Sequence, residues 1–153
     1  MALREIRYKE DDVLYKQCKA VTKFDEKLAI LLDDMYDTMQ KANGVGLAAP
    51  QIGILKRVVV IDIGEGRIEL INPEIIETKG SQNGTEGCLS FPGLFGEVER
   101  PDYVKVRAFD RNGKQFEIEG EQLLARAFCH ECDHLDGIVF TTHVTEYVDL
   151  DVE

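Results

Sequence analysis

The chain has 153 residues and a net charge of -11, with 44% hydrophobic and 31% charged residues. A chain of this length can bury roughly two-thirds of its unfolded surface, which predicts one domain over residues 1–153 with its own core. It contains no apolar run near the ~20 residues that cross a bilayer, and its acidity excludes the clustered Lys and Arg of a nucleic-acid surface. We therefore expect neither a membrane role nor direct nucleic-acid binding.

The N-terminal stretch MALREIRYKEDD has no apolar core of a secretory signal and too many acids for a transit peptide, which predicts a cytoplasmic location. Four cysteines are present: Cys18, Cys88, Cys129 and Cys132. In a reducing compartment we expect them to be free thiols or metal ligands and not a disulfide framework.

The first predicted element is an amphipathic helix over about 26–42. Asp25 is a suitable N-cap, and Asn43-Gly44 ends the pattern. Apolar residues recur between them at helical spacing and predict a core-facing stripe: Leu28, Leu31, Leu32, Met35 and Met39.

Strands follow this helix. KRVVVIDIG and RIELINPEII flank a Gly64-Glu65-Gly66 turn, and YVKVRAFDRNGKQFEIEG alternates on both sides of Asn112-Gly113, as expected of a hairpin. Residues 79–87, with three glycines, are predicted to form a polar loop. A second helix is predicted from Gly120 to about Asp136, with Gly137 as its stop. Strands between two helices, without a βαβ alternation, predict an α+β fold with small antiparallel or mixed sheets around the second helix.

The second helix carries His130-Glu131-x-x-His134. At about 100° per residue, the two histidines lie roughly 40° apart on one face, so both imidazoles can reach one cation. Glu131 lies one step around the helix, where a base acting on water beside the ion belongs. The pattern alone also occurs by chance, but here it takes two of only three histidines in the chain.

Cys129 and Cys132 form a Cys-x-x-Cys pair around the first histidine. On a helix the pair centres about 150° from the histidines and cannot join their ion. No second cysteine pair closes a structural zinc site, so we interpret both residues as facing the core.

A catalytic site needs a third protein ligand. The metzincin pattern places a histidine where this chain has Phe140, and few residues remain downstream for the glutamate that other zinc proteases use, namely Glu146 or Glu153. Upstream, Cys88 in EGCLS is the obvious candidate because a thiolate is a strong ligand for Fe(II) or Zn(II).

Three segments, GVGLAAPQIG (44–53), EGCLS (86–90) and HECDHLDG (130–137), resemble in order and spacing the signature motifs of peptide deformylases. The likeness runs from about Arg4 to Phe140. It implies removal of the formyl group from the formyl-methionine of N-formyl-methionyl peptides and nascent bacterial chains. It also implies Fe(II) as the native metal, with Zn(II), Ni(II) or Co(II) as substitutes.

The resemblance implies a role for each motif residue. The metal ligands fall on Cys88, His130 and His134, and the general base on Glu131. The donors that stabilise the oxyanion fall on the Gln51 side chain and the Leu89 backbone N–H.

For the substrate, the resemblance implies an extended peptide beside the first motif. Gly44 and Gly46 would let its backbone approach, although Gly44 also suits a turn that ends a helix. The predicted methionine pocket is lined by Val45, Leu123 and Ala127, each of which could equally be a core residue.

Some positions depart from the family pattern. Cys129 stands where Gln is common, and Gly84 and Thr85 replace bulkier or acidic residues, which predicts a more open pocket rim. The segment after Phe140 is short and acidic, so the basic C-terminal helix by which some relatives contact the ribosome is not expected. His143 is interpreted as a surface histidine.

Two other hypotheses remain open at this point. A zinc endoprotease would use Glu146 or Glu153 as its third ligand. A protein without catalysis would bind zinc, or form a disulfide, through Cys129 and Cys132.

Overall fold

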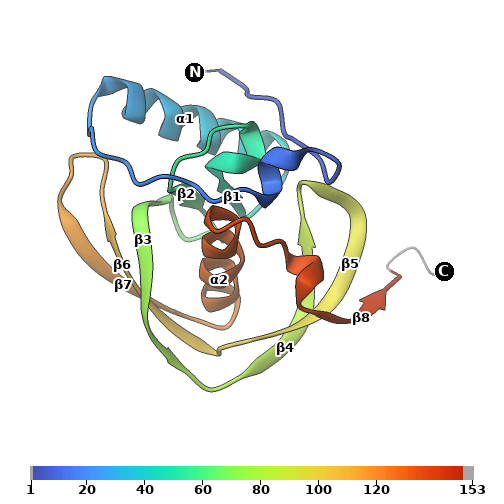
Figure 1. Cartoon of the computed structure of the whole chain (residues 1–153). Coiled ribbons are helices and arrows are strands. Elements are labelled where there is room, and N and C mark those ends of the chain that lie inside the picture. Colours follow the sequence, from blue (N-terminus) through green and yellow to red (C-terminus); the bar gives the residue numbers. More distant parts are fainter. Residues whose placement is uncertain (1, 150–153) are drawn as a thin grey trace.

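A computed structural model describes residues 2–149, and it places two antiparallel sheets around a central helix, α2 (Figure 1). The long strand β3 runs down one side of α2 and leads into β4 on the other side. The elements in chain order are η1 (Asp12–Tyr15), α1 (Glu26–Lys41), β1 (Gly46–Ala48), η2 (Ala49–Ile52), β2 (Val58–Ile61), β3 (Ile68–Lys79), β4 (Gln82–Cys88), β5 (Phe91–Arg100), β6 (Tyr103–Phe109), β7 (Gln115–Glu121), α2 (Leu123–Leu135), η3 (Phe140–Thr142) and β8 (Val144–Val148), where η marks a 3-10 turn. This arrangement confirms the predicted α+β class.

Helix α1 confirms the first predicted helix. The Asp25 side chain accepts a hydrogen bond from the Leu28 backbone N–H at 3.1 Å, as an N-cap does. At the other end Asn43 takes a left-handed conformation (φ 59°), and the Gly44 N–H donates to the Met39 carbonyl. This turn ends the helix and directs the chain into β1.

The larger sheet has the strand order β1-β2-β3-β6-β7, and each neighbouring pair is antiparallel. The predicted hairpin is confirmed as β6 and β7, with Val106 opposite Ile118 and Gly113 at φ 84° in the turn. The alternation in the sequence therefore reflects a sheet with one face on the core.

The smaller sheet has the order β4-β5-β8, and it corrects the prediction of a loop over residues 79–87. Residues 82–88 form β4, which pairs with β5 from Gln82 opposite Arg100 to Gly87 opposite Phe95. The strand was missed because its inward positions carry Gln82, Gly84 and Glu86, which are not apolar. Only Gly80, at φ 68°, and Ser81 lie between β3 and β4.

Helix α2 begins at Leu123 and not at Gly120, which is a second correction. Gly120 and Glu121 still pair with Val104 and Tyr103 as the end of β7. The change of direction falls on Gln122, whose φ of 53° and ψ of -117° lie outside the regions that side chains favour. Gly137, at φ 74°, follows the helix as predicted.

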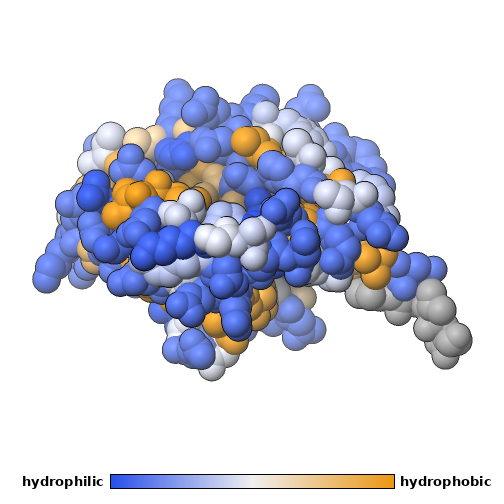
Figure 2. All heavy atoms as spheres, turned by 90° about the horizontal axis from the view of Figure 1, so that it is seen from below, coloured by the Kyte–Doolittle hydropathy of each residue, from blue (hydrophilic) through white to orange (hydrophobic). Residues whose placement is uncertain are grey.

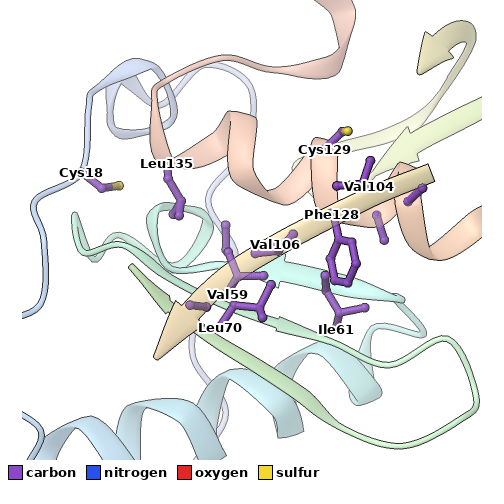
Figure 3. Packing of buried hydrophobic residues seen from close by; sticks show 13 residues of the cluster. Cys18, Val59, Ile61, Leu70, Val104, Val106, Phe128, Cys129 and Leu135 are labelled. Atoms are coloured by element: carbon purple, nitrogen blue, oxygen red, sulfur yellow. The ribbon is translucent and has the colours of Figure 1, made fainter. Parts of the chain in front are cut away.

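Both faces of β2 are buried, which explains its continuous apolar sequence. Val59 and Ile61 face α2 and pack in the cluster that contains Phe128 and Leu135 (Figure 3). Val58 and Val60 face the other way and pack against Leu32, Met35 and Met39 of α1. Each fully buried side chain of this size contributes roughly 1.5–3 kcal/mol to stability, so β1 and β2 are held firmly between the two helices.

The face shown in Figure 2 is mostly hydrophilic, with separate apolar patches. Within residues 2–149, neither helix is long and apolar enough to cross a membrane.

Candidate metal centre

Three side chains that the sequence predicted as metal ligands lie together. His130 and His134 project from α2. Cys88 is the last residue of β4 and faces them from that strand. The Cys88 Sγ lies 3.4 Å from the His134 Nε2, and one donor atom from each of the three residues lies within 4.8 Å of the others. Within the described chain, this is the one group of three or more such side chains that could hold a metal ion.

The spacing fits a metal ion. A tetrahedral ion bound at about 2.3 Å by sulfur and about 2.0 Å by nitrogen separates those two atoms by roughly 3.5 Å. The observed 3.4 Å between the Cys88 Sγ and the His134 Nε2 agrees with this value. One thiolate and two imidazoles are also a donor set that suits Zn(II) and Fe(II).

A buried carboxylate orients the first histidine. The His130 Nδ1 lies 2.9 Å from the Glu86 Oε1, which leaves its Nε2 for the ion. Arg100 donates two hydrogen bonds to the same carboxylate, from its Nε at 2.8 Å and from its Nη2 at 2.9 Å. Burial acts to raise the pKa of Glu86, but the bonds from Arg100 and His130 outweigh it and hold this pKa well below its usual range. The carboxylate is therefore charged and fixes His130 with its proton on Nδ1.

The second histidine is fully buried. Burial holds the pKa of His134 well below its usual range. A neutral imidazole is the form that binds a metal. Its Nδ1 has no hydrogen-bond partner among the described residues.

Glu131 lies buried next to this group, and its Oε1 has no hydrogen-bond partner in the described chain. Burial raises the pKa of Glu131 to about 7. The carboxylate lies against the backbone of Gly46, where an added Cβ would be 2.5 Å from the Glu131 Oε2. A carboxyl group with a pKa near neutrality can both accept and return a proton.

Gln51 is fixed by its own turn. Its Oε1 accepts from the Ala48 N–H at 3.0 Å, so its Nε2 points to the Ser90 Oγ at 3.1 Å and to the Cys88 Sγ at 3.4 Å. Leu89 follows Cys88 directly, and its side chain packs against Gly44. The side-chain amide of Gln51 therefore provides a hydrogen-bond donor beside the Cys88 thiol.

The site opens into a cleft of about 420 Å³. The predicted substrate-binding residues all line it, together with the predicted catalytic side chains: Gly44, Val45, Gly46, Gln51, Leu89, Leu123, Ala127 and Glu131. Val45 and Leu123 are 45% and 50% exposed, whereas Ala127 is buried. Large exposed apolar side chains at the rim of a cleft are typical of a binding site for an apolar group.

Three residues of the site were not predicted from the sequence: Glu86, Arg100 and Arg126. Glu86 belongs to the recognised EGCLS motif, but nothing in the spacing indicates that it bonds His130. Its two arginine partners come from β5 and α2, so only the fold brings them together.

The structure does not support the alternative ligands. Cys129 is buried in the core and Cys132 is half-buried. Burial raises the pKa of Cys129 to about 11 and also raises the pKa of Cys132, which disfavours the thiolate form, and neither residue belongs to the group of potential metal ligands found in the described chain. Glu146 is exposed on β8, and Glu153 lies outside the described residues. His143 is a surface residue, as predicted, and it bonds Asp133.

A thiolate and two imidazoles beside a buried carboxylate, at the base of a cleft, define the centre of a metal-dependent hydrolase. The comparisons with known proteins agree. Residues 3–149 match the Polypeptide deformylase family. The peptide deformylase of Caldicellulosiruptor bescii is 62% identical over 97% of this chain and 89% of that protein, and peptide deformylase 1 of Bacillus subtilis is 57% identical over 96% and 93%.

The peptide deformylase structure from Thermotoga maritima superposes with a TM-score of 0.93 at 44% identity, covering 95% of this chain and 99% of that one. The chain belongs to the peptide deformylase family, and it is a hydrolase.

Proposed function

We propose that this enzyme removes the N-terminal formyl group from formyl-methionyl peptides and from newly made protein chains. The observation that carries the proposal is the convergence of Cys88, His130 and His134 on one point beside the Glu131 carboxylate. Family membership supplies the substrate class, and the cleft supplies the room for a peptide end.

Cys88, His130 and His134 would hold the metal. Fe(II) is the proposed native ion, with Zn(II), Ni(II) or Co(II) as substitutes, because the donor set accepts all four. When bound, the ion would lower the pKa of a water molecule and polarise the formyl carbonyl.

Glu131 is the proposed general acid and base. Its carboxylate takes a proton from the attacking water and gives it to the departing amine. Its pKa of about 7 suits both transfers at neutral pH. Its unpartnered Oε1 is a buried acceptor with no competing donor among the described residues.

Gln51 and Leu89 are the proposed oxyanion donors. The Ala48 N–H holds the Gln51 amide so that its Nε2 faces the thiol of Cys88. A donor fixed before the reaction stabilises developing negative charge without reorganisation. The Leu89 N–H would provide the second donor, one residue beyond the proposed sulfur ligand.

The peptide would lie extended along Gly44, Val45 and Gly46. Strand β1 is at the edge of the larger sheet, so a peptide can add to it through backbone hydrogen bonds. Its methionine would enter the part of the cleft lined by Val45, Leu123 and Ala127. These side chains provide apolar contacts for a thioether.

The proposal extends to the whole chain and its setting. We propose that residues 1–153 act as a single domain, in the cytoplasm, on chains that emerge from the ribosome. Fractionation of cells that express the tagged chain tests the location, and recovery in a membrane fraction would contradict it.

The direct test is hydrolysis of formyl-Met-Ala-Ser by protein purified without oxygen and loaded with Fe(II) or Ni(II). We expect release of formate and a free amino terminus, and loss of both when the metal is removed by a chelator. No formate with any of the four metals, from protein that binds them, would overturn the proposal.

A further inference from the structure

The carboxylate of Glu86 uses all of its hydrogen-bond acceptor positions. Its Oε1 accepts from His130 Nδ1 and Arg100 Nη2, and its Oε2 accepts from Arg100 Nε and Arg126 Nη1. A carboxylate has about four acceptor positions, so these four donors saturate it. Its orientation, and through it that of His130, is set by both arginines.

Arg126 reaches this carboxylate from the same helix as the histidine. It lies one turn before His130 on α2 and is buried. Its Nη1 is 2.6 Å from the Glu86 Oε2 and 3.0 Å from the Val98 carbonyl, so it ties α2 to β4 and β5. It also lines the cleft next to Ala127.

Gly84 makes room for this guanidinium. A Cβ at position 84 would lie 2.9 Å from the Arg126 Nη2 and 3.1 Å from its Cζ. The first distance is shorter than real contacts of a Cβ and the second is unusually tight, so a side chain at 84 would shift the guanidinium from its place. Gly84 and Arg126 therefore form one structural unit, in which the absence of a side chain at position 84 leaves space for the guanidinium.

We propose that Arg126 is a positioning residue for the metal centre and acts through Glu86. With Arg126 in place, the Glu86 Oε1 stays directed at His130 Nδ1–H, which leaves the lone pair of His130 Nε2 available to hold a metal ion. The proposal rests on the proposed role of His130 as a ligand.

The charges around Glu86 support this role. Arg100 also bonds Asp133 at 2.9 Å, so Arg100 and Arg126 together balance the two carboxylates of Glu86 and Asp133. Without Arg126, Oε2 loses one donor, the cluster becomes net negative, and the buried carboxylate can turn. A residue that orients a metal ligand in this way typically changes metal affinity or activity by 10- to 100-fold when it is replaced.

The test measures Co(II) binding, because Co(II) absorbs light according to its ligands. Four variants of the full chain are titrated without oxygen: Arg126→Met, Arg126→Lys, Gly84→Ala and Arg107→Met. Arg107 lies on the surface and pairs with Glu117, so its variant is the matched control for loss of a guanidinium. The values of kcat and KM with formyl-Met-Ala-Ser are measured on the same samples.

We expect Arg126→Met to weaken Co(II) binding at least ~10-fold and to change the Co(II) spectrum. Arg126→Lys keeps the positive charge, so its Co(II) affinity should stay within ~3-fold of that of the original chain. Gly84→Ala, which moves the guanidinium without removing it, should fall between the two, and Arg107→Met should behave as the original chain. If Arg126→Met does not fold, Gly84→Ala and Arg126→Lys still decide the question, by the order of their Co(II) affinities.

The contrary result is an unchanged Co(II) affinity and spectrum in both Arg126→Met and Gly84→Ala, with a change in KM alone. It would show that Arg126 lines the cleft and contacts the substrate but does not position the metal centre. An original chain that binds no Co(II) would instead overturn the proposed function and this inference with it. The two failures are therefore distinguishable.

Discussion

The backbone of Gly46 lies directly against the carboxylate of Glu131, so that a Cβ at position 46 would be 2.5 Å from the Glu131 Oε2. From the sequence, a glycine at position 46 was expected to let a peptide substrate approach the backbone. The structure shows a second reason, because a side chain at this position would collide with Glu131. The first motif and the second helix therefore meet at the proposed general base.

Gly46→Ala should displace the Glu131 carboxylate. We expect kcat to fall at least ~10²-fold, the scale of a positioned general base, while the metal content stays that of the original chain. Steady-state kinetics and elemental analysis on one preparation measure both quantities. For comparison, Gly44→Ala meets the flexible Leu89 side chain at 2.7 Å and should lower kcat less. Equal losses in the two variants would contradict the account of Gly46.

Glu131→Gln keeps the shape of the side chain but removes its ability to accept a proton. Turnover should fall at least ~10²-fold with metal retained, because the ligand atoms belong to other residues. Loss of the metal with turnover preserved would mean that Glu131 is a ligand and not the base.

Asp34 ties the start of the chain to α1. It accepts from the Ala2 N–H at 2.9 Å and from Arg4 Nε at 2.8 Å. Burial acts to raise the pKa of Asp34, but these two donors outweigh it and lower the pKa below the ordinary 3.8. Its stabilising effect is therefore complete above about pH 4 and is lost as the pH falls through the lower pKa of the folded state.

Asp34→Asn should lower the free energy of unfolding by about 1 kcal/mol at pH 7, given that Arg4 is partly exposed. The difference from the original chain should shrink as the pH falls below about 4. Urea unfolding at several pH values measures it. A difference that grows toward low pH would have the wrong sign for this carboxylate.

Gln122 has a backbone conformation that suits glycine, at φ 53° and ψ -117°. Gln122→Gly should relieve the strain and raise the free energy of unfolding by about 0.5–1 kcal/mol, after the entropy cost of glycine. Thermal and urea unfolding measure the change. A less stable variant would show that the turn before α2 is not strained.

Much of the site was predictable because its motif residues fall into three short segments. The helical spacing of His130 and His134 predicted their common face, and elimination pointed to Cys88 as the third member. The buried residues that orient His130 were not predictable in the same way. Glu86, Arg100 and Arg126 come from two strands and a helix, and their contact depends on how the smaller sheet packs against α2.

The fold was predicted best where the pattern of apolar residues has one simple period. Helix α1 and the β6–β7 hairpin meet that condition. Strand β4 does not, because its inward side chains serve the site: Gln82 and Glu86 bond Arg126, and Gly84 leaves space for it. The start of α2 was placed early because Gly120, a strand residue, resembles a helix boundary.

The central claim is that Cys88 joins the two histidines as a metal ligand, and Co(II) titration of three chains tests it most directly. The original chain and the Cys129→Ala/Cys132→Ala double variant should both show the absorption of a cobalt–thiolate bond, and Cys88→Ser should lose it and bind Co(II) much more weakly. If the band persists in Cys88→Ser and disappears in the double variant, the metal is bound by the other cysteines and the proposed centre is wrong.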